Sequence, residues 1–453
     1  MAITLLKNIH TLATMNDGLD EFQDAAILIN NQQIQYVGPT SGLPSVDVDQ
    51  EIDLSHHVVL PGLINTHHHM YQSLTRAVRS AQDAELFGWL KTLYPIWERI
   101  TPPMLRASTR TAVAELLLSG CTTTSDHLYL YPNGSRLEDT IYAAQEMGIR
   151  FHACRGAMSV GESKGGLPPD SLVEDEREIL RDMQQLVERF HDASDHAMLR
   201  IALAPCSPFS VSRELMRDTA LLARELGVSL HTHLAENQND LDYSREKFGC
   251  TPAEYVEELG WVGPDVWHAH CVHLDQAGIE LFARTGTGVA HCPCSNMRLG
   301  SGIAPIRKML DHKVPVGLGV DGSASNDGGS LINEARQAML LQRVAHQDPR
   351  LLPAREALWM ATRGSAQVLN RSDIGQLSVG YAADLIAFDL RTVNFAGAGQ
   401  DPIAATLFCQ SGSVAYSFVN GQMLIDQGQL IHNDLSNIVA THNALSHELL
   451  TSS

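Results

Sequence analysis

Apolar runs alternate with amphipathic stretches through the middle of the chain. Eight runs read as buried strands, and each is followed by a stretch whose apolar positions recur at helical spacing. The eight predicted strands end near His69, His127, Arg155, Cys206, His233, His270, Cys292 and Asp321. The predicted helices include Pro103–Ser119, Asp175–His191, Arg213–Leu226 and Leu331–Arg343. Eight strand–helix units over about 300 residues predict an α/β fold of the (β/α)8 type, the TIM barrel.

Short β patterns occupy both ends of the chain. Ala25–Ile29 and Gln33–Gly38 read as strands near the N-terminus, and Ala383–Asp389 and Val414–Val419 read as strands near the C-terminus. An Asn-Gly pair, a strong signal for a hairpin turn, follows the last of these. We therefore expect a small β-sandwich domain that is built from both termini.

Three segments follow from this pattern. Residues 1–58 are expected to form the first part of the β-sandwich, residues 59–367 the barrel, and residues 368–453 the second part of the sandwich with a C-terminal tail. The first ten residues lack the basic stretch, the sustained apolar core and the cleavage site of a signal peptide, so we expect a strand there.

Composition argues against several classes of partner. The chain carries 52 acidic and 32 basic residues, a formal net charge of −20, and no basic stripe. This charge disfavours a nucleic acid or an anionic membrane surface as partner. No run of about 18 apolar residues is present, so we expect no membrane span. The eight cysteines are scattered apart from a lone C-x-C at Cys292 and Cys294, so we expect free thiols in a reducing cytoplasm.

Histidines end the first and fifth predicted strands at a spacing that suits metal ligands. His67 and His69 lie two residues apart, so both side chains point to one face of a strand. His231 and His233 repeat this arrangement, and we expect His233, nearer the strand end, to ligate while His231 supports the site from deeper in the barrel. Asp321 follows a very apolar strand, where an unpaired carboxylate is costly to bury. Imidazole and carboxylate together predict a divalent metal site; a helix N-cap is the alternative for this aspartate.

Further candidates lie beside these ligands. Glu236 comes three residues after His233, where the chain leaves the strand, and it can reach over the metal without ligating it. On the sixth strand we expect His270, at the C-terminal end, to be the functional histidine. His268 is expected deeper on the same face and His273 beyond the barrel top, both as polar residues with satisfied hydrogen bonds.

These motifs, in this order, resemble those of the amidohydrolase superfamily, in its mononuclear-metal deaminase branch. The segments that carry the resemblance are Pro61–His67, His233–Glu236, His270 and Asp321–Asn326, and they are similar to those of triazine hydrolases and of purine and pterin deaminases. The resemblance covers the whole chain. It implies that one divalent metal, Zn²⁺ or alternatively Fe²⁺, is held by His67, His69, His233 and Asp321. The fourth strand carries no lysine of the kind that bridges two metals in binuclear relatives, which favours one metal per chain.

The resemblance also implies hydrolytic deamination. Water activated by the metal attacks the ring carbon that bears an exocyclic amine, and Asp321 acts as the base. Glu236 shuttles a proton to the ring nitrogen and then toward the leaving ammonia. His270 polarises the reacting centre; in some relatives this histidine also ligates the metal, so its part in ligation stays open.

Three residues bear on the substrate. Gln72 follows His69 at the spacing of guanine deaminases, where the amide grips a purine edge. Trp89, in the loop region after the first strand, is placed to stack on a flat ring. A surface glutamine and a core tryptophan are the alternatives. Cys206 stands where adenosine-type relatives carry histidine, which favours a free base over a nucleoside.

Taken together, these features are most similar to deaminases that convert 8-oxoguanine and water to urate and ammonia. Hydroxyatrazine-type N-alkyl aminohydrolases and guanine or isoxanthopterin deaminases are the alternatives within this group. A non-catalytic scaffold with the same fold is disfavoured because every ligand position is filled. The expected partner is a small heterocyclic substrate, and the resemblance implies a homo-oligomer.

Overall fold

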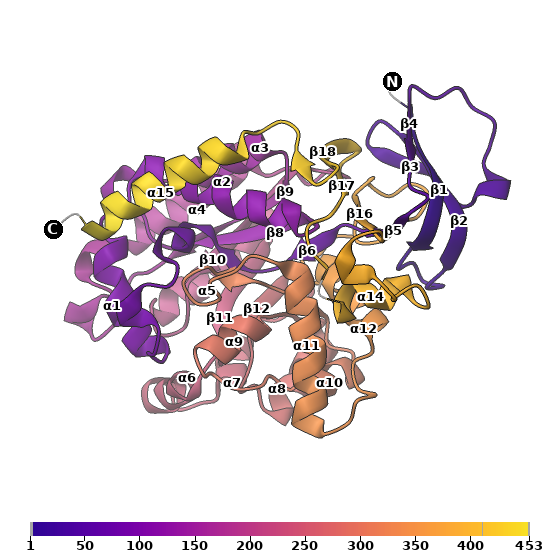
Figure 1. The fold of residues 1–453 in the computed structure, drawn as a ribbon. Helices are drawn as coiled ribbons and strands as arrows, with labels where there is room; N and C mark the ends of the chain where they lie inside the picture. The colour runs from indigo at the N-terminus through magenta and orange to yellow at the C-terminus, as the bar shows by residue number, and fades with distance from the viewer. Residues whose placement is uncertain (1–2, 410, 452–453) are drawn as a thin grey trace.

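A computed structural model describes residues 3–409 and 411–451 of the chain. Its centre is a closed barrel of eight parallel strands, each paired with its neighbour in chain order (Figure 1). The strands are β6 (Leu63–Asn65), β8 (Cys121–Leu128), β9 (Arg150–Ala157), β10 (Leu199–Pro205), β11 (Ser229–Leu234), β12 (Val266–His270), β13 (Gly288–His291) and β14 (Val316–Leu318). The predicted TIM barrel is confirmed.

Helices on the outside of the barrel connect these strands. They include α2 (Pro102–Leu118), α3 (Leu137–Met147), α4 (Glu176–Phe190), α5 (Arg213–Leu226), α7 (Pro252–Glu258), α8 (Gln276–Thr285), α10 (Ile306–Asp311) and α11 (Leu331–His346). Local capping sets their ends: Ser212 accepts the Leu215 N–H before α5, and Gly227, with a φ of 68°, closes that helix in the left-handed conformation. The four predicted helices correspond to α2, α4, α5 and α11.

Strands from both termini form one nine-stranded mixed sheet beside the barrel. The N-terminal part is β1 (Ile3–Ala13), β2 (Glu21–Asn30), β3 (Gln33–Pro39), β4 (Gln50–Asp53) and β5 (His57–Pro61); the C-terminal part is β16 (Leu385–Asp389), β17 (Tyr416–Val419), β18 (Gln422–Asp426) and β19 (Gln429–Leu430). Antiparallel pairing of β5 with β16 joins the two parts. The small β domain expected from both termini, predicted as a sandwich, is present as one mixed sheet with a hydrophobic cluster of its own.

A buried ion pair links the sheet to the base of the barrel. Arg150, at the start of β9, lies 3.1 Å and 3.0 Å from the two carboxylate oxygens of Asp384, just before β16, and neither side chain is more than 3% exposed. A bidentate pair of this kind fixes orientation as well as distance. Because this pair lies where the barrel strands begin, the barrel mouth, where the strands end, is at the opposite end from the sheet.

The C-terminal helix leaves the sheet and returns to the barrel. Helix α15 (Leu435–Thr451) lies across α2 in Figure 1. His442 Nε2 donates to the carbonyl oxygen of Ser73 at 3.0 Å, and the Ser446 hydroxyl donates to that of Leu74 at 2.7 Å. The tail thereby supports the segment that follows β7 (His68–His69), next to the barrel mouth.

The remaining elements are shorter or inserted. They are α1 (Leu86–Trp97), α6 (Gln238–Tyr243), α9 (Pro293–Arg298), α12 (Ala354–Trp359), α13 (Ser365–Val368), α14 (Pro402–Phe408) and the strand β15 (Asp321–Gly322). All eight cysteines are free thiols, as predicted. Across the described ranges, no helix combines the length and the apolar character needed to cross a membrane.

Candidate metal centre and active site

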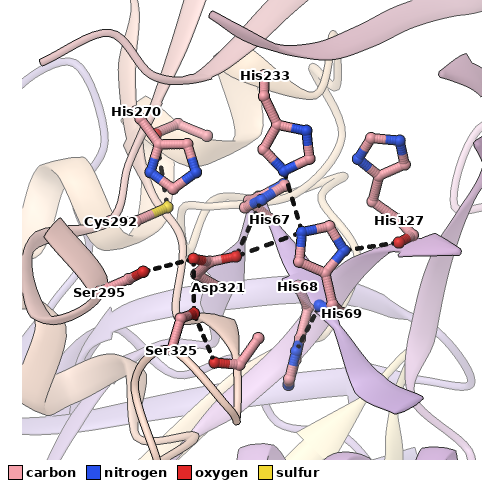
Figure 2. A network of polar contacts seen from close by, with 12 residues as sticks. His67, His68, His69, His127, His233, His270, Cys292, Ser295, Asp321 and Ser325 are labelled. Atoms are coloured by element: carbon pink, nitrogen blue, oxygen red, sulfur yellow. Dashed lines mark hydrogen bonds and ion pairs between the residues drawn. The ribbon is translucent and has the colours of Figure 1, made fainter. Parts of the chain in front are cut away.

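Four side chains converge at the C-terminal mouth of the barrel. The short strands β7 and β15 pair in parallel, and the Asp321 N–H donates to the His67 carbonyl oxygen at 3.1 Å. Asp321 Oδ1 lies 3.2 Å from His67 Nε2 and 3.4 Å from His69 Nε2. At the end of β11, His233 places its Nε2 3.0 Å from His69 Nε2 (Figure 2). The structure thus brings the four predicted ligands together.

Two hydrogen bonds in series fix the protonation of His67. His231 Nδ1 donates to the Trp267 carbonyl oxygen at 3.0 Å, which leaves Nε2 of the neutral ring as an acceptor. That nitrogen accepts from His67 Nδ1 at 2.8 Å. His67 Nε2 is therefore unprotonated and directed at Asp321, and it has no hydrogen-bond partner among the described residues.

Backbone carbonyls fix the other two histidines in the same way. His69 Nδ1 donates to the His127 carbonyl oxygen at 2.7 Å, and His233 Nδ1 donates to that of Cys206 at 2.6 Å. Burial lowers the pKa of His233 to about 3 and holds that of His69 below its ordinary value, so both rings are neutral near pH 7. Their Nε2 atoms consequently face each other with no proton between them.

These atoms fit a divalent cation. Two unprotonated nitrogens 3.0 Å apart repel each other, and Asp321 Oδ1 is a buried acceptor without a partner in the described part of the chain. A cation satisfies all of these lone pairs at once, whereas an apolar group would satisfy none. Three imidazoles and a carboxylate suit Zn²⁺ or Fe²⁺. Among the described residues, two groups of possible ligand atoms lie within 4.8 Å of one another: His67, His69, His127 and His233, and His67, His270 and Asp321.

Two serines hold the second oxygen of Asp321. Ser295 Oγ lies 2.5 Å and Ser325 Oγ 2.9 Å from Asp321 Oδ2, which stabilises the ionised carboxylate (Figure 2). Asp321 has a φ of 61°, and Ala235 and His270, also at the barrel mouth, have φ values of 50° and 70°. Left-handed backbone at residues other than glycine is strained, and such strain clusters at functional sites.

A small cavity adjoins the candidate ligands. One wall is apolar and comes from Leu86, Trp89, Leu90, Tyr94, Phe209 and Leu299; the polar part includes Gln72, Cys206, Glu236 and His270 together with His69, His233 and Asp321. All of these residues are buried. The arrangement is suited to a flat apolar ring that carries polar groups along one edge.

Glu236 and His270 form a pair in this cavity. His270 Nδ1 donates to Asn296 Oδ1 at 2.9 Å, and His270 Nε2 lies 3.5 Å from Glu236 Oε2. Burial raises the pKa of the Glu236 carboxyl well above its usual range, and the negative charges of Asp240 and Asp321 raise it further. Glu236 therefore keeps its proton at pH values where an exposed glutamate is ionised, as a proton donor requires.

Gln72, Cys206 and Trp89 all line the cavity. Gln72 is on a 3-10 helix (Met70–Thr75), buried rather than at the surface, and its Oε1 has no partner among the described residues. Burial raises the pKa of the Cys206 thiol to about 12, so this thiol stays protonated. Trp89 lies on α1 and not in a loop, and its Nε1 donates to the Ala324 carbonyl oxygen at 3.0 Å.

His268 does not lie where the sequence predicts. Trp267 rather than His268 points into the barrel, where its ring stacks on His231 at a centroid distance of 4.5 Å. His268 faces outward and stacks on Phe282 of α8, and its Nε2 donates to a backbone carbonyl at 3.0 Å. The left-handed backbone at His270 breaks the strand alternation, so His270 turns toward the cavity although His268 does not.

Sequence reasoning missed several residues around the ligands. His127 stacks on His233 at 5.0 Å, and its carbonyl oxygen holds His69. The only signal for His127 was its place at the end of the second strand. Ser325 lies within the Asp321–Asn326 segment that carries the family resemblance, but neither Ser295 nor Ser325 was assigned a role, because their contact with Asp321 depends on loops from two different strands.

Comparisons with known proteins agree with this geometry. Residues 58–424 match the Amidohydrolase family. Over 452 residues the chain is 44% identical to an 8-oxoguanine deaminase from Pseudomonas aeruginosa, which covers 99% of this chain and 100% of the relative. It is 38% identical to a hydroxydechloroatrazine ethylaminohydrolase from Pseudomonas sp. strain ADP, over 95% of this chain and 92% of the relative.

A solved structure is similar along nearly the whole length. It is an atrazine chlorohydrolase from Arthrobacter aurescens TC1 complexed with zinc, with a TM-score of 0.93 and 35% identity, over 98% of this chain and 100% of that chain. The family match, the relatives and the His/Asp metal site agree. The chain belongs to the amidohydrolase family, in its deaminase branch.

Proposed function

We propose that the protein deaminates 8-oxoguanine to urate. In this reaction the carbon–nitrogen bond to the exocyclic amine breaks, a carbon–oxygen bond to water forms, and ammonia leaves. The strongest support is the 44% identity to an 8-oxoguanine deaminase across nearly the full length of both chains. The small cavity beside the proposed metal ligands, with one apolar wall and polar groups along the other side, supports a flat heterocycle as substrate.

His67, His69, His233 and Asp321 would hold one divalent metal, most simply Zn²⁺. When bound, this metal supplies a Lewis acid that makes water nucleophilic near neutral pH. Asp321 is the base, because its Oδ1 faces the ligand cluster while its Oδ2 is held by two hydroxyls. It accepts the proton that the attacking water loses.

Glu236 is the proton donor to the substrate ring. Its raised pKa keeps the carboxyl protonated, and protonation of the ring nitrogen beside the amine makes the ring carbon more electrophilic. His270 Nε2 lies 3.5 Å from the Glu236 carboxyl. There it holds the carboxyl in position and polarises the ring carbon that reacts. The ionised Glu236 then takes the second proton of the former water as the carbonyl forms and passes it to the amine, which leaves as ammonia. The proton held by Asp321 then restores the Glu236 carboxyl.

Three residues bind the ring. Gln72 presents to ring N–H groups a carbonyl oxygen that has no hydrogen-bond partner among the described residues. Cys206 offers a thiol that stays neutral. Trp89 belongs to the apolar wall and stacks on a flat ring, with its own N–H already bonded to the backbone.

Initial rates of ammonia release test the proposal. The zinc-loaded protein is assayed with 8-oxoguanine, guanine, isoxanthopterin, adenosine and hydroxyatrazine. We expect kcat/KM for 8-oxoguanine to exceed that for guanine by about 100-fold, since a missing polar group leaves its buried partner unpaired. A preference for hydroxyatrazine, in line with the 38% identical ethylaminohydrolase, would contradict 8-oxoguanine as the substrate but would leave the proposed metal-dependent hydrolysis standing.

A further inference from the structure

Glu334 is a buried carboxyl outside the cavity. It lies in the first turn of α11 and is 1% exposed. Its Oε2 accepts the backbone N–H of Cys294 at 3.1 Å, and its Oε1 accepts Asn326 Nδ2 at 2.8 Å. Cys294 lies in α9, which follows β13, and Asn326 lies in the segment after β15. One carboxylate therefore connects the segment after β13 with the segment after β15.

The first segment connects Glu334 to Asp321 through adjacent residues. Ser295 follows Cys294 in α9 and donates its hydroxyl to Asp321 Oδ2 at 2.5 Å. Ser295 is fully buried, so this hydroxyl has no competing bulk water. The position of the Ser295 hydroxyl thus depends on the N–H of Cys294 that Glu334 holds.

The second segment also connects Glu334 to Asp321 through two adjacent residues, but here the serine precedes the residue that contacts Glu334. Asn326 contacts Glu334, and the preceding residue, Ser325, places its Oγ 2.9 Å from Asp321 Oδ2. Ser325 Oγ also lies 2.9 Å from the Gly322 carbonyl oxygen, so its one hydrogen is shared between two acceptors. Two parallel bridges therefore run from Glu334 to the same oxygen of Asp321.

We propose that Glu334 is a positioning residue for Asp321. It fixes the two serines that hold Oδ2, so that Oδ1 faces His67 and His69. The left-handed backbone of Asp321 is strained, and this side-chain network opposes its relaxation. The inference rests on the proposed role of Asp321 as metal ligand and base.

The chemistry of the bridges requires a carboxylate at this position. The groups that face Glu334, namely the Cys294 N–H, the Cys294 thiol and the Asn326 amide N–H, are all donors. A glutamine has one acceptor oxygen and one donor NH₂ group, so it has to leave one of the two bridges unmade. Glu334→Gln keeps the shape of the side chain and removes one bridge, which makes it the informative substitution.

Cobalt binding tests the proposal in the full-length protein. We expect Glu334→Gln to weaken Co²⁺ affinity, measured by competition with a chelator, about 10-fold or more and to shift the visible bands of bound Co²⁺. We also expect a fall in kcat with little change in KM. Glu356→Gln is the matched control, because this acid on α12 pairs with Arg307 and touches neither bridge.

The double variant Ser295→Ala/Ser325→Ala separates positioning from a loss of folding. We expect it to weaken Co²⁺ binding by itself, and Glu334→Gln to add little on top of it, since both changes act through the same contacts. Wild-type Co²⁺ affinity in either variant, or losses that simply add, would overturn the proposal. Because Co²⁺ binding needs no turnover, a failure to release ammonia from any substrate would count against the proposed function alone.

Discussion

His231 Nε2 accepts a hydrogen bond from His67 Nδ1 at 2.8 Å, behind the cluster of proposed metal ligands. His69 and His233 donate their second nitrogen to backbone carbonyls, whereas His67 donates to a side chain. The tautomer of His67 therefore depends on a residue that can be exchanged by mutation, and this contact offers a clean test of how the metal site is organised.

We predict that His231→Ala weakens metal binding about 10- to 100-fold, because His67 then loses the acceptor that fixes its orientation. Metal content after dialysis and chelator competition measure the effect. His268→Ala is the control: this buried histidine lies on the neighbouring strand but faces outward against α8. Equal metal affinity in the two variants would show that the hydrogen bond to His67 has no such role.

Glu236→Gln is expected to keep the metal and lose most turnover. The amide cannot donate a carboxyl proton to the ring, and removing general acid–base catalysis costs about 10²- to 10⁴-fold in kcat. Steady-state kinetics together with metal analysis check this, with Glu246→Gln on an exposed surface as the comparison. Normal turnover by Glu236→Gln would remove this residue from the proton-transfer role.

Gln72→Leu is expected to reduce kcat/KM about 10- to 100-fold with no change in metal content. The substitution keeps the bulk of the side chain but removes the carbonyl oxygen that has no partner among the described residues. Gln276→Leu, on the exposed face of α8, is the matched control. An unchanged kcat/KM would mean that Gln72 only fills space in the cavity wall.

Asp126 predicts a pH dependence of stability. This fully buried carboxyl accepts the Met70 N–H at 2.8 Å, and burial raises its pKa from 3.8 to about 7. Between those two pH values the folded chain keeps a proton that the unfolded chain has lost, so stability falls as pH rises through this window. Relative to Asp126→Asn, the wild type should lose about 4 kcal/mol of unfolding free energy between pH 4 and pH 7.

Urea unfolding of the metal-free wild type and of Asp126→Asn at several pH values measures this difference. The variant carries no titrating group at the position, so all other groups cancel in the comparison. Two stability curves that run parallel with pH would contradict the raised pKa of Asp126.

The positions of the proposed metal ligands could be predicted from the sequence because each is fixed locally. His67 and His69 lie two residues apart on one short extended segment, so their side chains share a face. Asp321 follows an apolar strand whose direction is set by the barrel. Only the order of the strands around the barrel was needed to bring them together. The same reasoning placed Glu236, which follows His233 by three residues.

Other features depend on contacts or backbone geometry that a sequence pattern does not carry. His268 was expected to share a face with His270, but the left-handed φ of 70° at His270 breaks the alternation. Trp89 was expected in a loop, although its segment forms helix α1. Glu334 fits the polar positions of an amphipathic helix, and its burial arises only when two distant segments fold over it.

The most direct test of metal-dependent deamination is the stoichiometry of the reaction before and after metal loading. 8-Oxoguanine is incubated with metal-free protein and then with protein reconstituted with one equivalent of Zn²⁺ per chain, and urate and ammonia are measured together. We predict no product before loading and, after loading, one urate and one ammonia for each 8-oxoguanine consumed. Equal rates with and without metal, or consumption without ammonia, would contradict the account.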